Sequence, residues 1–179
     1  MTPNKTINII FLFILFSGLT ACRKTIVDND YLVSFTDTIK DGCGYKNSKG
    51  EIVIPEGKYA MCITDTFKTY AIVGKSNVGI IGIDRKENTM YKVFVFDNGP
   101  DEPSDGLFRI MVSNKIGYAD AATGAIVIKP QFDCAWPFEH GVAKVSNDCK
   151  TETEGEHSSW VSDHWFYINT AGKKVKSLE

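Results

Sequence analysis

The amino-acid sequence repeats one pattern of apolar and polar positions four times. In each copy a short apolar or aromatic run ends on Asp or Asn, as in the segment GYADAATGAIVI from Gly117 to Ile128. An Asx side chain opens a tight turn, and a following glycine takes positive φ without steric cost, so each copy predicts a β-hairpin. The Asx positions are Asn47, Asp84, Asp120 and Asn169, and glycines follow the first, third and fourth of them at Gly50, Gly124 and Gly172.

A second shared segment closes these copies. In GLFRIMV, from Gly106 to Val112, alternation directs Phe108 and the other apolar side chains to one face and Arg109 to the opposite face. The segment GVAKV, from Gly141 to Val145, has the same pattern with Lys144 as its basic residue. Both segments predict half-buried strands whose basic side chain lies on the outer face.

Together these patterns predict an all-β fold of repeated antiparallel hairpins or three-stranded units in a curved or partly closed array. Residues 148–164 interrupt the pattern and are expected to form a solvated loop insertion. A first strand is expected at residues 31–35, and the last unit either caps the array or pairs with that strand. The expected units cover residues 42–75, 76–113, 114–147 and 165–175 within a domain spanning residues 31–179.

The stretch DCAWPFEHGVAKV, from Asp133 to Val145, collects residue types that are common in active sites. Glu139 and His140 precede a glycine in the same way that Ser104 and Asp105 precede Gly106, so a turn accounts for them without catalysis. Trp136 and Phe138 are interpreted as packing residues, and Phe67 occupies a similar place one copy earlier.

The N-terminus has the order of a secretory signal: one positive charge, an apolar run that is too short to span a membrane, and then small residues. The segment LTAC, residues 19–22, resembles the lipobox of bacterial lipoproteins. This resemblance implies a signal peptide at residues 1–21, acylation of Cys22, and a tether at residues 22–30. Since no Asp follows Cys22, the sorting rule of such lipoproteins favours the outer membrane, on its periplasmic or surface face.

Four cysteines remain in the mature chain, and an oxidising compartment favours two disulfides among the three pairings that can be drawn. The pairs nearest in sequence are Cys43 with Cys62 and Cys134 with Cys149. Reactive or metal-bound thiols are less favoured, because the chain has no C-x-x-C pair.

The segment from Gly117 to Val145 resembles the repeat of WG repeat proteins, a bacterial family. Less complete matches lie at residues 44–59, where Cys43 replaces Trp, and at residues 165–175, where Phe166 replaces Gly. The resemblance implies an all-β repeat array in a cell envelope or a secreted setting. It implies no catalytic residues and no cofactor, and stacked repeats usually serve binding.

The chemistry outside the repeats leaves alternatives open. Residues 97–105 hold four acids and read either as a calcium site or as an ordinary turn, although their spacing fails the EF-hand pattern. In the insertion, Trp160 and Trp165 are candidate ligand contacts, and Trp165 also fits a core position. His157 and His164 are the candidate zinc ligands of a metal-assisted hydrolase, although no helical metal-binding spacing is present.

The expected function is a non-catalytic binding or structural module, anchored in the envelope through Cys22, with an envelope protein or peptide as its partner. The hydrolase and a secreted small-ligand binder without lipid are the alternatives. With a formal net charge of −2 and no basic stripe, nucleic acid is not an expected partner.

Overall fold

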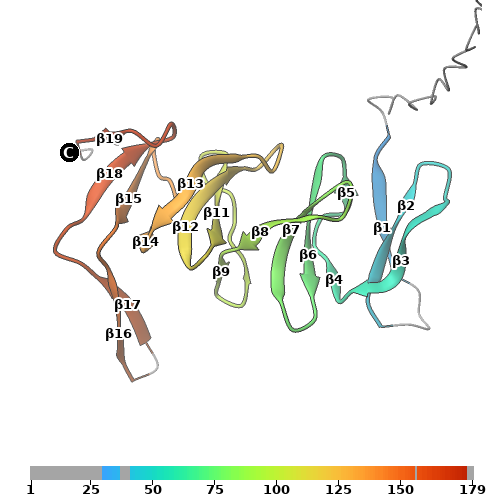
Figure 1. Ribbon diagram of the computed structural model, residues 1–179, viewed down its shortest axis with the longest axis horizontal. Helices are drawn as coiled ribbons and strands as arrows, with labels where there is room; N and C mark the ends of the chain where they lie inside the picture. Colours follow the sequence, from blue (N-terminus) through green and yellow to red (C-terminus); the bar gives the residue numbers. More distant parts are fainter. Residues whose placement is uncertain (1–29, 37–40, 156, 177–179) are drawn as a thin grey trace, which may run out of the picture.

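The computed structural model describes residues 30–36, 41–155 and 157–176, and its regular structure throughout is β-strand (Figure 1). The predicted all-β class is confirmed. Within those residues, no helix has the length and apolar character needed to cross a membrane. The predicted signal peptide, Cys22 and most of the predicted tether lie outside the described residues.

The described chain folds into four three-stranded antiparallel units. Units 3 and 4 begin with the segments that close the preceding sequence copies, from Gly106 and Gly141. Unit 1 contains β1 (Leu32–Phe35), β2 (Cys43–Asn47) and β3 (Ile52–Tyr59), and unit 2 contains β6 (Tyr70–Lys75), β7 (Gly79–Asp84) and β8 (Thr89–Val93). Unit 3 contains β11 (Leu107–Val112), β12 (Lys115–Asp120) and β13 (Ile126–Phe132), and unit 4 contains β15 (Val142–Ser146), β18 (Phe166–Asn169) and β19 (Lys174–Val175).

Short strands in the connecting segments join the units. Strand β4 (Met61–Cys62) pairs with β6, β14 (Cys134–Ala135) pairs with β15, and β5 (Thr66–Phe67) pairs back with β1. Units 2 and 3 join directly through β8 and β11, and β9 (Val95–Phe96) with β10 (Gly99–Pro100) forms a small ribbon between them.

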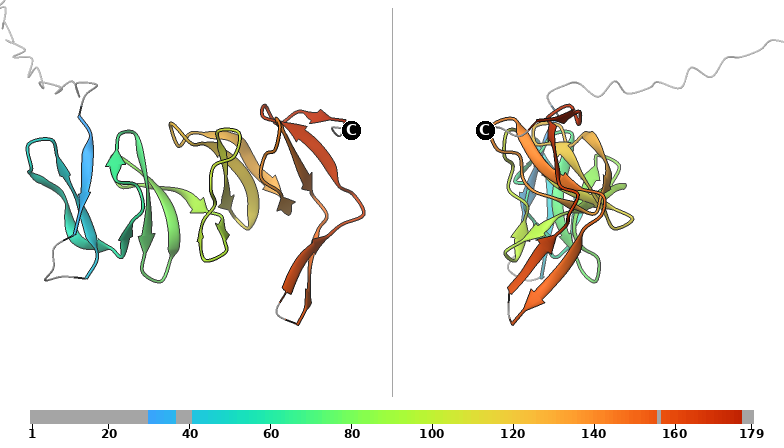
Figure 2. Two further views of the ribbon diagram at one scale, coloured as in Figure 1. Left: turned by 180° about the vertical axis from the view of Figure 1, so that it is seen from behind. Right: turned by 90° about the vertical axis from the view of Figure 1, so that its left-hand side faces the viewer.

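The four units stand side by side in an open row, with unit 1 and unit 4 at opposite ends of the long axis (Figures 1 and 2). Strand β1 pairs with β2 and β5, and β18 pairs with β15 and β19. Of the two arrangements expected for the last unit, the structure therefore has the one in which it caps the row.

The four predicted Asx turns are confirmed. The side-chain oxygen Oδ1 of each Asx residue accepts backbone N–H groups from residues two to four positions later, at 2.8–3.1 Å. In the second copy, where the sequence has no glycine, Glu87 takes the left-handed position with φ 64°. Side-chain hydrogen bonds from Asn88 and Thr123, together with these backbone N–H groups, lower the pKa values of Asp84 and Asp120, because they stabilise the charged carboxylates.

The buried side chains form three clusters, and each cluster lies between two successive units. Tyr45, Ile54, Val73 and Ile83 are among those between units 1 and 2. Tyr91, Val93, Phe108 and Ile110 lie between units 2 and 3, and Leu107, Tyr118, Val145 and Ile168 lie between units 3 and 4. No unit in the described chain has a core of its own, so each depends on its neighbour, as in other stacked-repeat proteins.

The insertion differs from the prediction. Instead of a solvated loop across residues 148–164, the chain forms a hairpin from β16 (Lys150–Glu154) and β17 (His157–Val161), which projects from the row beside unit 4 (Figure 2). It occupies the place of the turn between the first two strands of a unit. In unit 3 that turn has only two residues, Ser113 and Asn114, both at positive φ.

Candidate functional site

The candidate site is a groove formed by the connecting segments and by unit 4. Two adjoining cavities, of about 430 Å³ and about 850 Å³, share Trp136, Pro137 and Glu139 in their walls. Phe96 lies in the larger cavity and is 65% exposed, and Trp136 is 44% exposed. We call these two cavities together the aromatic groove. The interpretation of Trp136 as a packing residue is wrong, whereas Phe138 is buried as predicted.

All three tryptophans of the chain line the smaller cavity. The ring centroids of Trp136 and Trp160 are 5.6 Å apart with an edge-on arrangement, and Trp160 makes a similar contact with Phe94 at 5.7 Å. The ammonium of Lys144 lies 4.9 Å from the ring centroid of Trp165. Trp160 and Trp165, the predicted contact aromatics, are thus brought together, and Trp136 joins them.

The hairpin insertion brings Trp160 to the groove. In the hairpin register Trp160 faces Thr151, and alternation along β17 separates its side from that of Val161. The indole packs against the cluster between units 3 and 4, while Val161 is exposed. The Trp160 side chain therefore anchors the hairpin and supplies one wall of the groove.

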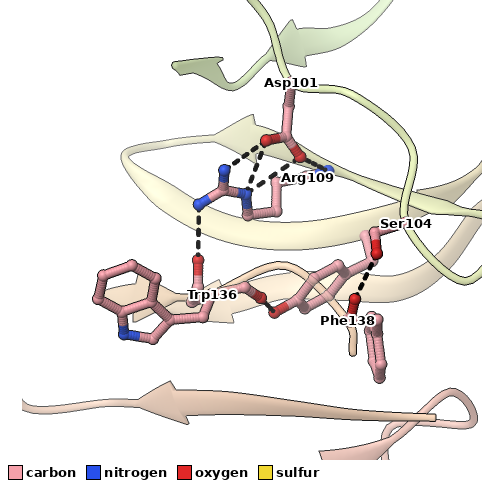
Figure 3. Close-up of polar contacts among 7 residues, drawn as sticks. Asp101, Ser104, Arg109, Trp136 and Phe138 are labelled. Carbon is pink, nitrogen blue, oxygen red and sulfur yellow. Dashed lines mark hydrogen bonds and ion pairs between the residues drawn. The ribbon is translucent and has the colours of Figure 1, made fainter. Parts of the chain in front are cut away.

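A buried ion pair between Asp101 and Arg109 lines the larger cavity. Figure 3 shows its contacts. Asp101 and Arg109 are both nearly inaccessible to solvent; their charged groups form a close ion pair, and Nε of Arg109 lies 3.0 Å from each carboxylate oxygen. The backbone N–H of Arg109 also donates to Asp101, at 2.8 Å. A buried ion pair is stable only when the remaining hydrogen-bonding groups of both side chains have partners. Here the guanidinium of Arg109 also donates to the carbonyl of Ala135 and lies over the ring of Phe94. Arg109 lies on the strand between Phe108 and Ile110, but it is buried as they are, so the prediction of a half-buried strand is wrong here.

Two equivalent turns join the walls. The two central residues of each turn, Asp105–Gly106 and His140–Gly141, have positive φ. The residues on either side of each pair exchange two backbone hydrogen bonds, Ser104 with Leu107 and Glu139 with Val142. The hydroxyl of Ser104 donates to the carbonyl of Phe138 at 2.5 Å (Figure 3). The N–H of Gly141 donates to the carboxylate of Asp105 at 2.7 Å. The turn predicted for Glu139 and His140 is confirmed, and it links two connecting segments.

Tyr118 supports the groove from beneath. Its hydroxyl donates to the carbonyl of Trp136 at 2.6 Å, and its ring packs edge-on against Phe138 with centroids 4.7 Å apart. Burial raises the pKa of the Tyr118 phenol far above its ordinary value, since a tyrosinate would lose its hydration there. The backbone that carries Trp136 is thus held by a phenol that stays neutral.

The acids of the groove differ in their pairing. Asp101 is neutralised by Arg109, so this member of the 97–105 acids is committed to the fold. Asp97, Glu102 and Glu139 are exposed, and their carboxylates form no ion pair within the described part of the chain. The segment is a turn, as one of the two interpretations held, and the described residues contain no group of three or more potential metal ligands.

The two candidate zinc histidines are separated. His157 begins β17 at the hairpin tip, where it pairs with Glu154, and His164 follows the other end of that strand. The five residues of β17 span about 16 Å. This distance is too long for two residues whose side chains must bind the same zinc ion. The imidazole Nδ1 of His164 instead contacts an oxygen of Asp148 at 2.9 Å on an exposed surface.

Both disulfides have the pairing suggested by sequence proximity. Cys43–Cys62 links unit 1 to β4, and Cys134–Cys149 links β14 to the residue before β16. The second bridge therefore fixes the base of the inserted hairpin next to the segment that carries Trp136.

The fold and the groove define a class: an all-β array of short antiparallel units that stack through shared cores. Residues 116–150 match the model of the WG containing repeat, so this part of the chain is a WG repeat. The match begins in β12 of unit 3 and ends at the first residue of the inserted hairpin, so it includes Trp136 and Glu139. Searches of curated proteins and of solved structures gave no significant match.

Proposed function

We propose that this protein is a non-catalytic binding module, held at the bacterial cell envelope by acyl chains on Cys22, and that the aromatic groove is its binding site. The observation that carries the proposal is the convergence of all three tryptophans on one cavity. Tryptophan and other large aromatic side chains dominate the binding energy of protein surfaces when a partner covers them. The exposed Phe96 extends the same surface.

The architecture supports a binding role. The groove is formed where connecting segments meet, and loops held on a rigid β scaffold commonly carry recognition. Its walls are joined by the Ser104–Phe138 and Asp105–Gly141 hydrogen bonds, so little ordering is required when a ligand binds. A metal-assisted hydrolase has less support, because strand β17 separates His157 from His164. We therefore propose no enzymatic activity.

Photo-crosslinking in intact envelopes tests the binding site. A crosslinking amino acid replaces Trp136 in one variant and Val53 in another; both side chains are about half exposed, and Val53 lies in unit 1 at the opposite end of the row. We expect a discrete crosslinked partner from position 136 only. Equal products from the two positions would contradict the assignment of the groove.

Mass spectrometry of the mature N-terminus tests the anchor. We expect a chain that begins at Cys22 and carries several acyl groups, and we expect Cys22→Ser to release the protein from membranes. An unmodified Cys22 in a freely secreted chain would favour the lipid-free small-ligand binder instead.

A further inference from the structure

The groove runs along the row of units. Its walls include Ile63 in the segment that joins units 1 and 2, Ile72 in β6 of unit 2, Phe96 and Glu102 between units 2 and 3, and Trp136 between units 3 and 4. The smaller cavity continues from Trp136 onto unit 4. A ligand that fills both cavities therefore crosses several units, which suits an extended chain better than a compact molecule.

The charge of the groove is unbalanced. Asp97, Glu102 and Glu139 are exposed carboxylates without an ion-pair partner in the described chain. The walls hold one arginine, one lysine and one histidine: Arg109 is neutralised by Asp101, and Lys144 and His140 remain. The open part of the groove is therefore acidic and attracts positive charge.

The aromatic side chains add a second preference for cations. Rings attract ammonium and guanidinium groups over their faces, and the stems of lysine and arginine cover apolar surface at the same time. The protein already uses this contact at the groove, with Arg109 4.2 Å from the ring centroid of Phe94 and Lys144 over Trp165. Phe96 and Trp136 are exposed beside the unpaired acids.

We propose that the aromatic groove binds an extended, basic peptide segment of a partner protein. Lysine or arginine side chains of the segment pair with Asp97, Glu102 and Glu139, and its apolar side chains cover Phe96 and Trp136. This proposal rests on the assignment of the groove as the binding site and adds the chemistry of its ligand.

The test uses the full mature protein in neutral detergent micelles and tryptophan fluorescence, which reports on the groove because all three tryptophans line it. The probes are three synthetic peptides of about eight residues, about 26 Å when extended, that alternate leucine and proline with lysine, glutamate or serine. One variant combines Asp97→Asn, Glu102→Gln and Glu139→Gln. A control with the same change in charge combines Asp41→Asn, Glu51→Gln and Glu154→Gln, which lie outside both cavities.

We expect the lysine peptide to change the fluorescence and to bind about tenfold more tightly than the serine peptide, with the glutamate peptide weakest. The groove variant should lose that preference, the control variant should retain it, and salt should weaken it. Equal binding of the three peptides, no binding of the lysine peptide, or a preference retained in the groove variant would overturn the proposal. A discrete crosslink from position 136 would still support the binding site in each of these cases, which separates the two proposals.

Discussion

Two glycines of the repeat are required by backbone that faces them. A Cβ atom at Gly44 would lie 2.4 Å from the carbonyl oxygen of Ile54, and one at Gly117 would lie 2.4 Å from that of Ile128. Both strands are opposite an irregular register, where the partner strand approaches closely. In unit 4 the equivalent residue is Phe166, and there the facing strand β19 has only two residues. The departure from Gly at this position thus has a structural reason.

Gly124 is predicted to be more sensitive to substitution than Gly50. Both have positive φ in equivalent turns, but a Cβ at Gly124 would lie 2.2 Å from the ring of Tyr70, whereas nothing lies within 4 Å at Gly50. We expect Gly50→Ala to lower the free energy of unfolding by about 1 kcal/mol and Gly124→Ala by about 2–4 kcal/mol. Urea denaturation measures both, and equal losses would contradict the contact between units.

Alkaline pH is predicted to destabilise the protein through buried phenols. Burial raises the pKa values of Tyr45, Tyr91 and Tyr118 above the ordinary value of 10.0, and that of Tyr59 to about 12. A group whose pKa is raised by folding contributes stability that is complete below pH 10 and is lost as the pH rises through the folded-state value. For Tyr118 alone the loss is about 1.4 kcal/mol per pH unit above pH 10.

Denaturation measured at several pH values compares the wild type with Tyr118→Phe, which removes the ionisable group and leaves the ring. The variant should show the shallower loss above pH 10, and lysine deprotonation should affect both proteins alike. Parallel curves would show that Tyr118 ionises in the folded state without cost.

At the level of elements, unit 4 is the place where the array acquires its site. Its first and second strands pair as in the other units, but the turn between them is replaced by the hairpin β16–β17. An isolated two-stranded hairpin is only marginally stable in water, so this one requires attachment to the body. The disulfide Cys134–Cys149 and the packing of Trp160 provide it.

Removal of each disulfide is predicted to have a different local effect. The bridges close loops with sequence separations of 15 and 19 residues, so replacing either pair by alanine should cost about 3 kcal/mol. Loss of Cys134–Cys149 should also change the tryptophan emission, because that bridge anchors the hairpin beside Trp136. Loss of Cys43–Cys62, in unit 1, should leave the native emission unchanged, and an equal change in both variants would contradict the local anchoring role.

For the whole molecule, the open row implies that stability is shared between neighbours rather than collected in one core. Each turn also contacts the unit before it: Glu87 accepts a hydrogen bond from Tyr59, and Tyr91 donates to the carbonyl of Gly124. Among the described residues no unit precedes the first one, and its turn at Gly50 is open. Coupling in such arrays decreases with distance along the row.

Phe67→Ala tests this arrangement. Phe67 is fully buried between units 1 and 2 and packs edge-on against Tyr45 with centroids 5.3 Å apart. We expect a loss of about 3–5 kcal/mol, with hydrogen exchange accelerated in units 1 and 2 and nearly unchanged in unit 4. The matched variant Phe138→Ala, in the equivalent place between units 3 and 4, should show the reverse distribution. Uniform acceleration in both variants would indicate one cooperative core.

The sequence by itself determined the local structure. The Asx turns, the alternating strands, the repeat and the turn at Glu139–His140 depend on interactions within a few residues, which appear directly as sequence pattern. The disulfide pairs are close in sequence for the same reason. The insertion is the local exception. Thr, Ser and Glu in residues 150–161 suggest solvent exposure, and Gly155, which has positive φ between β16 and β17, is the one turn residue that indicates the hairpin.

Only the tertiary structure decided the site. Trp136, Trp160 and Phe96 come from three separate segments, and their convergence depends on how units 2 to 4 stack. Arg109 shows the same limit. Alternation placed it on the face opposite Phe108, and that face is covered by the connecting segments on both sides: Asp101 comes from the segment before β11, and Ala135 from the segment after β13. Local pattern specifies turns and strands because their contacts are short in sequence. The groove, and the cover that the segment of Ala135 gives to the Asp101–Arg109 pair, are set by packing between more distant segments, which such a pattern does not encode.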